Sequence, residues 1–134
     1  MIKNIHQWEK AIVEMLNLDG WQLTHTGKGN LSWDAIGKTP NGNDCVIEMK
    51  FRKTYYEDKM LEKFKYDKLI ATGKVALYFV NDPKGNYLFW LNDLQQLNEV
   101  EMLCPDTTLW TKKKIKKPCY LINEKYATVI NINS

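Results

Sequence analysis

The stretch Asp44-Cys45-Val46-Ile47-Glu48-Met49-Lys50-Phe51-Arg52 decides the fold of this 134-residue chain. Every second residue in it, from Cys45 to Phe51, is apolar, which is typical of a β-strand and puts Glu48 and Lys50 on the same face. Another strand is predicted just before it, at residues 31–36, and the Asn-Gly pair between the two is a strong hairpin signal. We therefore predict a β-hairpin that carries charged side chains on one face.

The length of the hairpin loop decides whether Asp34, in the first strand, shares that face. With a three-residue loop over 40–42, Asp34 lies opposite Glu48. Directly opposed residues of antiparallel strands have Cβ atoms about 5 Å apart. A two-residue turn would oppose Asp34 to Met49 and place it on the other face. An Asp34–Glu48 pair therefore requires an odd loop or a bulge.

The residue types Asp, Glu and Lys in this arrangement point to metal-assisted chemistry. Two carboxylates on one face repel each other unless a cation or a proton lies between them. A small number of hard oxygen ligands suits magnesium or manganese. Lys50 could orient or deprotonate a water there, or stabilise charge on a phosphate. Asp44 competes with Asp34 as a ligand, but it lies about 13 Å from Glu48 along the strand, too far to share an ion. Ordinary surface charge is the alternative interpretation.

Composition and length favour one folded domain over residues 1–134. A hydrophobic fraction of 44% with five Trp, seven Tyr and four Phe excludes a disordered chain. No apolar run approaches the roughly 18 residues of a membrane span, and the N-terminus lacks the apolar core of a signal peptide. The three cysteines have no metal-binding spacing, which indicates reduced, partly buried thiols. We expect a cytoplasmic protein with no membrane partner.

Basic residues gather in two places, around the second hairpin strand and in a run at 112–117, although the net charge is only +3. Basic residues beside a carboxylate pocket are typical of proteins that bind nucleic-acid phosphates. The alternative for both groups is a solvated helix face and a charged loop. The expected nucleic-acid contacts are Lys53, Lys59, Lys63, Lys112, Lys113 and Lys114.

Hydrophobic periodicity predicts the remaining elements. Helices are expected at 2–17, 57–71 and 92–98, and strands at 21–25, 75–80, 87–91, 119–122 and 127–130. The run at 75–80 is apolar throughout, as expected of a central strand buried on both faces. The expected core positions of the two longer helices are Ile5, Trp8, Ile12, Met15 and Leu16 in the first, and Met60, Leu61, Phe64, Leu69 and Ile70 in the second.

This order of elements resembles the αβββαβ core of the PD-(D/E)xK nuclease superfamily, whose restriction-endonuclease-like fold is shared by restriction enzymes, Holliday junction resolvases and phage nucleases. Asp34 is similar to the family's first metal-binding position, and Glu48-Met49-Lys50 to its (D/E)xK tripeptide. The resemblance implies an α/β fold with a central mixed sheet flanked by helices and a short C-terminal extension. Two positions depart from the pattern: Trp33 stands in place of the Pro that the family pattern has but many members lack, and Glu62 stands where the RecB-like branch has Gln.

The first helix is also similar to that of resolvase-like members, in which an acidic residue points toward the active site. Glu9 matches that position, with Glu14 as the second candidate. The resemblance implies that Asp34, Glu48 and the main-chain carbonyl of Met49 hold Mg²⁺ or Mn²⁺. Lys50 would position or activate the attacking water. Glu9 would hold a second ion or orient the site.

The implied activity is metal-dependent hydrolysis of DNA phosphodiester bonds. No segment resembles a base-reading helix, so structure-selective cleavage of junctions or branched DNA, or non-specific cleavage, is expected. Cutting both strands calls for two active sites, which a homodimer would supply. Two other classes of function stay open: a non-catalytic nucleic-acid-binding module of the same fold, and a phage-type factor that binds a host protein.

Overall fold

The computed structural model describes residues 2–27, 33–105 and 114–131. Its elements follow in the order α1 (Ile2–Leu18), β1 (Gln22–His25), β2 (Ala35–Lys38), β3 (Asp44–Phe51), β4 (Asp58–Glu62), α2 (Lys63–Ala71), β5 (Val75–Asp82), β6 (Gly85–Trp90), the 3₁₀ turn η1 (Leu91–Asp93), β7 (Asn98–Pro105), β8 (Lys114–Asn123), the 3₁₀ turn η2 (Glu124–Tyr126) and β9 (Thr128–Val129). Neither helix in these ranges has the length and apolar character needed to cross a membrane.

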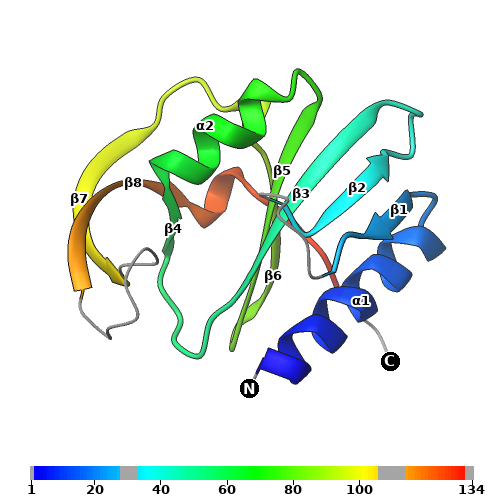
Figure 1. The fold of residues 1–134 in the computed structure, drawn as a ribbon, viewed down its shortest axis with the longest axis horizontal. Coiled ribbons are helices and arrows are strands. Elements are labelled where there is room, and N and C mark those ends of the chain that lie inside the picture. The colour runs from blue at the N-terminus through cyan, green and yellow to red at the C-terminus, as the bar shows by residue number, and fades with distance from the viewer. Residues whose placement is uncertain (1, 28–32, 106–113, 132–134) are drawn as a thin grey trace.

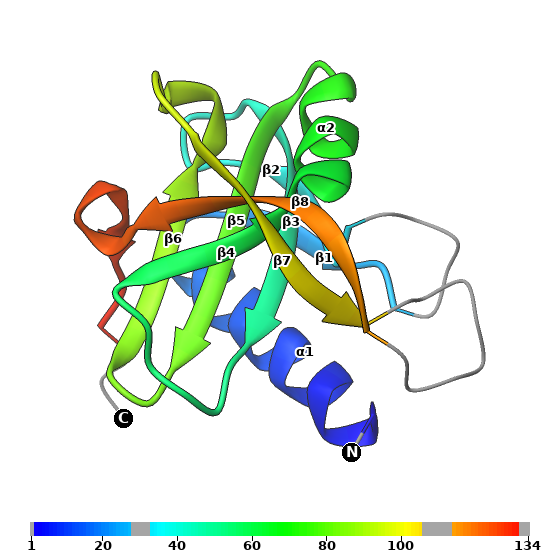
Figure 2. The same cartoon turned by 90° about the vertical axis from the view of Figure 1, so that its left-hand side faces the viewer.

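A six-stranded sheet in the order β1-β2-β3-β5-β6-β9 forms the centre of the described structure (Figure 1). Strands β3 and β5 run parallel and the other neighbours antiparallel, so the sheet is mixed, as predicted. Helix α1 covers one face. Helix α2 and a second sheet, β4-β8-β7, cover the other face, and Figure 2 shows the second sheet crossing the strands of the first. The large sheet thus separates two hydrophobic clusters.

Helix α1 packs through one stripe of apolar side chains. Ile12, Val13 and Leu16 are buried against the large sheet at the spacing expected of an amphipathic helix. The predicted core positions Ile5 and Trp8 are wrong, because 40% and 49% of these residues are exposed. They belong to the N-terminal half of the helix, and Trp8 lies beside the ring of Phe51 instead.

The hairpin of β2 and β3 has the predicted odd loop. Thr39 donates its N–H to the carbonyl of Asn43 at 2.9 Å, and Ala35 pairs with Ile47, which continues to Asp34 opposite Glu48. Gly42 adopts φ +85°, a conformation that L side chains rarely take. The loop prediction is confirmed, and it sets which side chains share a face.

Strand β5 is the buried centre of the large sheet. Residues 76–80 are all at most 2% exposed, as expected of an apolar run covered on both faces. Alternate side chains enter the two clusters, Leu77 and Phe79 toward α1, Tyr78 and Val80 toward α2 and the small sheet. This strand lies next to β3 and supports the hairpin from behind.

The helix predicted at 57–71 is wrong in its first part, because residues 58–62 form β4. Strand β4 pairs with β8, which lies about 60 residues later in the chain. Lys59 and Leu61 point inward and are buried, whereas Phe64 is 63% exposed rather than in the core. Cross-strand pairing therefore overrides the local helical pattern.

The helix predicted at 92–98 is also wrong. Only the 3₁₀ turn η1 forms there, and Asn98 begins strand β7. Strands β7, β8 and β4 build the small sheet, and hydrophobic periodicity predicts only part of β8 among them. All three cysteines are buried and unbridged, as expected of reduced thiols.

Candidate active site

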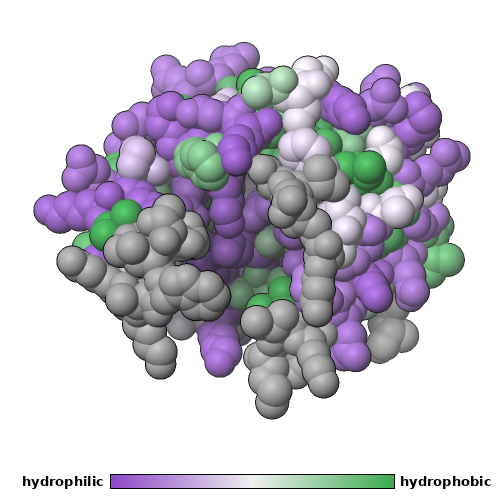
Figure 3. Space-filling model, viewed as in Figure 1, coloured by the Kyte–Doolittle hydropathy of each residue, from purple (hydrophilic) through white to green (hydrophobic). Residues whose placement is uncertain are grey.

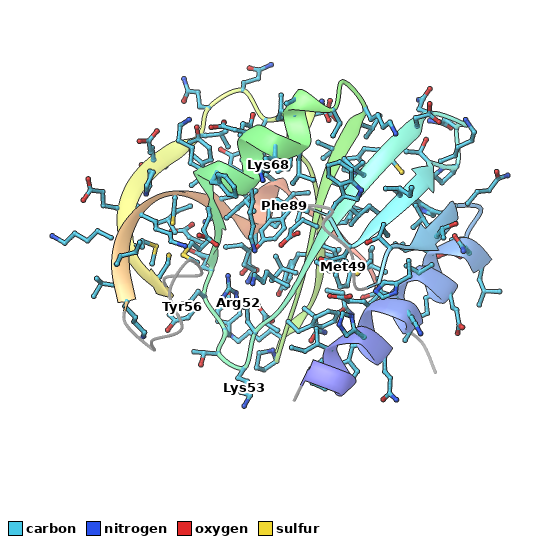
Figure 4. The ribbon with its side chains drawn as sticks, viewed as in Figure 1. Met49, Arg52, Lys53, Tyr56, Lys68 and Phe89 are labelled. Atoms are coloured by element: carbon cyan, nitrogen blue, oxygen red, sulfur yellow. The ribbon has the colours of Figure 1, made fainter. Side chains whose placement is uncertain are left out.

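A cavity of about 380 Å³ opens beside the C-terminal half of β3. The cavity lies beside the part of β3 that extends beyond the first residue of β2. Side chains of α1 and α2 line its other sides. Figure 3 shows a recess with mainly hydrophilic side chains in the middle of the same face, and Figure 4 shows Met49 and Arg52 around it. The side chains that line the cavity are Ile5, Glu9, Trp33, Asp34, Glu48, Met49, Lys50, Phe51, Arg52 and Lys65.

Asp34 lies one residue before β2 and is held by two hydrogen bonds to β3. Its own N–H donates to the carbonyl of Ile47 at 2.8 Å, and its Oδ2 accepts the N–H of Met49 at 2.7 Å. Burial raises the pKa of Asp34, against the lowering effect of the Met49 hydrogen bond. Among the described residues, its Oδ1 has no hydrogen-bond partner and is available to a ligand.

The main chain of Met49 also faces the cavity. In a strand, the N–H and C=O of one residue point to the same side. The N–H of Met49 donates to the side chain of Asp34, so it points toward β2. The pairing of β2 with β3 ends at Ala35 and Ile47, which leaves a gap beside Met49. The carbonyl of Met49 therefore points into the same gap.

Glu48 is a buried carboxylate, only 6% exposed. Its Oε2 accepts a hydrogen bond from Lys65 Nζ at 3.1 Å. Burial raises the pKa of Glu48 to about 7, although the charge of Lys65 opposes this. Without a further cation, Glu48 therefore titrates near neutral pH, and its carboxylate form favours binding one.

Two lysines complete the polar wall, and they have opposite pKa shifts. Burial lowers the pKa of Lys50, and the neighbouring charge of Lys65 lowers it further. Burial also acts to lower the pKa of Lys65. The negative charge of Glu48 and the hydrogen bond between the two side chains outweigh this and raise the pKa of Lys65. Of the two lysines, Lys65 is thus the one that keeps its charge more firmly, and Lys50 is the amine that loses its proton more readily.

Of the two acids considered on the first helix, the structure brings Glu9 to the cavity and leaves Glu14 exposed. Glu9 is 6% exposed, and its Oε1 lies 2.7 Å from Nε2 of His25 and 3.4 Å from Nδ1 of His6. Asp34, Glu48, Lys50 and Glu9 therefore line one cavity. By contrast, Asp44 is exposed and bound to Lys38 at 2.8 Å.

The lysines predicted to contact nucleic acid lie in different settings. Lys59 requires a correction: it is 4% exposed and its ammonium group is bound to Asp82 at 2.7 Å, so it cannot reach a phosphate. Lys53 is exposed in the loop after β3, where Figure 4 shows it at the turn, and Lys114 is exposed at the start of β8. Lys63 is bound to Asp67 at 2.7 Å. Lys112 and Lys113 fall outside the described residues.

Sequence reasoning does not find Lys65 or His25 as site residues. Lys65 has a usable signal, because it lies four residues before the buried Leu69 and so shares the inward side of α2. His25 has none, since its contact with Glu9 joins two elements 16 residues apart. Lone histidines at the end of a strand are common and carry no spacing that indicates such a partner.

The residues present fit a hard divalent cation. Asp34 and Glu48 supply carboxylate oxygens, and Met49 supplies a carbonyl oxygen, which are ligand types that magnesium and manganese take. One oxygen of each carboxylate is already engaged, Asp34 Oδ2 by Met49 and Glu48 Oε2 by Lys65. These contacts orient the second oxygen of each group.

The fold has a counterpart among solved structures. The solved structure of Hjc, a Holliday junction resolvase from the archaeal hyperthermophile Archaeoglobus fulgidus, matches with a TM-score of 0.60 and 17% sequence identity, over 92% of this chain and 89% of that one. No model of a known protein family matches the sequence, and neither does any curated protein. The chain therefore has the restriction-endonuclease-like α/β fold, with β4 inserted between the third strand and the second helix of the predicted αβββαβ core.

Proposed function

We propose that this protein is a divalent-metal-dependent nuclease that hydrolyses DNA phosphodiester bonds. One observation carries the proposal: two carboxylates line one cavity with Lys50 and Lys65. They belong to the half-buried Asp34 and the buried Glu48, which lie opposite each other across β2 and β3. The fold shared with a Holliday junction resolvase supports it. Lys65 and the Met49 N–H each engage one carboxylate oxygen, and buried acids with raised pKa values beside a cavity are typical of functional sites.

In this proposal Asp34, Glu48 and the carbonyl of Met49 hold Mg²⁺ or Mn²⁺. When bound, the ion neutralises the carboxylates and stabilises negative charge on the phosphate. Because the pKa of Glu48 is about 7 in the absence of an ion, protons compete with the ion below that pH. Glu9, whose Oε1 faces the histidines, orients the cavity wall or holds a second ion through its other oxygen.

The two lysines have separate roles in the proposed reaction. Lys50 positions the attacking water, and its neutral form, which burial favours by lowering the pKa of the amine, is proposed to accept a proton from that water. The water oxygen forms a bond to phosphorus, the bond to one ribose oxygen breaks, and that oxygen takes a proton from solvent. Lys65, which keeps its charge, holds Glu48 in place and attracts the phosphate.

The DNA backbone is proposed to contact basic residues on the segments that follow β3 and β4 and at the start of β8, namely Lys53, Lys63 and Lys114. Lys112 and Lys113, which lie outside the described residues, are proposed as further contacts from the sequence alone. Backbone contacts position the duplex without reading its sequence. We therefore propose cleavage that depends on DNA structure, with a homodimer supplying the second active site where both strands are cut.

A panel of DNA substrates tests this proposal. We expect a four-way junction or a branched DNA to be cut in Mg²⁺ or Mn²⁺, and no cleavage of any substrate in a chelator. Affinity should fall with salt, with a logarithmic slope near −0.9 for each duplex phosphate neutralised. Gel assays of junction, flap, single-stranded and linear duplex DNA give the result. Binding without cleavage in every metal would favour the non-catalytic module, and no DNA affinity would favour the protein-interaction factor.

A further inference from the structure

Two histidines and a glutamate meet beside the cavity. His6 and Glu9 lie one turn apart on α1, and His25 ends β1. One nitrogen or oxygen atom from each residue lies within 4.8 Å of the other two. Glu9 and His25 have only 7% and 9% of their side chains exposed, whereas His6 has 30% and leaves a route to solvent.

We propose that His6, Glu9 and His25 bind a transition-metal ion, with zinc as the preferred metal. Two imidazole nitrogens and one carboxylate oxygen are a ligand set that zinc takes in proteins, with a fourth position open to water or another ligand. Magnesium instead prefers oxygen ligands alone, so this cluster and the Asp34–Glu48 pair select different ions. The inference goes beyond the proposed nuclease function and does not depend on it.

The two distances to Glu9 suit a small tetrahedral ion after a modest adjustment, and the two histidine nitrogens lie within 4.8 Å of each other. Ligand bonds of about 2.0 to 2.1 Å place neighbouring donor atoms about 3.3 Å apart. His6 Nδ1 and Glu9 Oε1 already lie 3.4 Å apart. His25 Nε2 and the same oxygen lie 2.7 Å apart, a hydrogen-bond distance, and would separate by about 0.6 Å as the ion replaces the shared proton.

A second observation points to a ligand at this place. Nδ1 of His6 is buried from solvent, yet it has no hydrogen-bond partner in the part of the chain that the structure describes. Its 3.4 Å contact with Glu9 is too long and poorly directed to count as one. Buried polar atoms in proteins are almost always paired, and an ion between His6, Glu9 and His25 would supply the missing partner.

A metal here would connect two elements and the cavity. It would tie the N-terminal half of α1 to the end of β1, which pack together in the described structure. It would also fix Oε1 of Glu9 and leave the rest of that carboxylate on the cavity wall. Metal-bound carboxylates hold a defined orientation, so the cluster would set where Glu9 points.

Cobalt substitution tests the inference on the complete chain. Co²⁺ in a tetrahedral site with imidazole ligands absorbs strongly in the visible range, whereas an octahedral all-oxygen site absorbs weakly. We expect one such absorbing ion per chain, displaced by one equivalent of zinc. His6→Ala and His25→Ala should each weaken zinc binding at least tenfold in a competition titration with a chromophoric chelator.

Two control variants separate this site from its surroundings. Glu14→Gln changes an exposed acid on the same helix and should keep the cobalt spectrum. Glu48→Gln should also keep it while affecting cleavage, so the two proposals fail independently. Circular dichroism shows whether each histidine variant folds. If His25→Ala does not fold, His6→Ala, at a partly exposed helix position, tests the proposed site by itself. A wild-type protein without the tetrahedral spectrum, or a folded His6→Ala protein with unchanged zinc affinity, would overturn the inference.

Discussion

Glu48→Gln is expected to lower the rate of DNA cleavage by roughly three orders of magnitude. The substitution keeps the size of the side chain but removes the charge that holds the metal ion, and it weakens the contact with Lys65. DNA binding should persist or tighten, because one negative charge near the phosphate backbone is lost. Single-turnover cleavage at saturating DNA measures the first effect, and fluorescence anisotropy in a chelator measures the second.

Glu14→Gln is the matched control, since it makes the same chemical change at an exposed position on α1. It should cleave at the wild-type rate. Equal losses in the two variants would mean that the effect is not specific to the cavity. A Glu48→Gln protein that cuts at the wild-type rate would remove Glu48 from the mechanism.

Lys59→Ala is expected to destabilise the fold by about 3 to 5 kcal/mol. The ammonium group of Lys59 is 2.7 Å from Asp82 Oδ2, with 3% and 1% of the two side chains exposed. The rings of Tyr55 and Tyr87 lie over it at 4.5 and 4.2 Å. Without Lys59, the buried charge of Asp82 would be supported, among the described residues, by the N–H groups of residues 84 and 85, and this favours the lower end of the range.

Lys63→Ala provides a direct comparison, because Lys63 makes a contact of the same length with Asp67 at an exposed position. Exposed ion pairs contribute little to stability, so no measurable change is expected. Urea unfolding of the two variants, analysed with a common dependence on denaturant, makes the comparison. Equal stabilities for Lys59→Ala and the wild type would show that the buried pair is not a major support of the fold.

Local signals predicted the hairpin well, and they failed where distant strands decide the structure. The Asn-Gly turn, the alternation in β3 and the positions of Asp34 and Glu48 all lie within about 20 residues of sequence, so the register follows from local rules. Residues 58–62 form a strand only because β8 pairs with them. Nothing near Lys59 in the sequence indicates that its charge is neutralised by Asp82.

The same distinction applies to the candidate site. The cavity acids on β2, β3 and α1 follow from strand parity and from the resemblance to a known core. Lys65 and His25 reach the site residues Glu48 and Glu9 only because α2 and β1 pack where they do, and this packing depends on the whole fold. Strand β7 has a signal that periodicity could use, since Val100, Met102 and Cys104 alternate with exposed residues. The signal is weak because it is short and because Leu103, one of the exposed residues between them, is itself apolar.

Manganese location in crystals tests the central claim most directly, namely that Asp34 and Glu48 form a divalent metal site. Crystals soaked in Mn²⁺ should show an anomalous difference peak between the two carboxylates, with oxygen ligands at about 2.1 to 2.2 Å. The carbonyl of Met49 should be among these ligands, and the peak should vanish in Glu48→Gln crystals. A peak only at His6, Glu9 and His25, or none at all in crystals grown with DNA, would contradict the assignment.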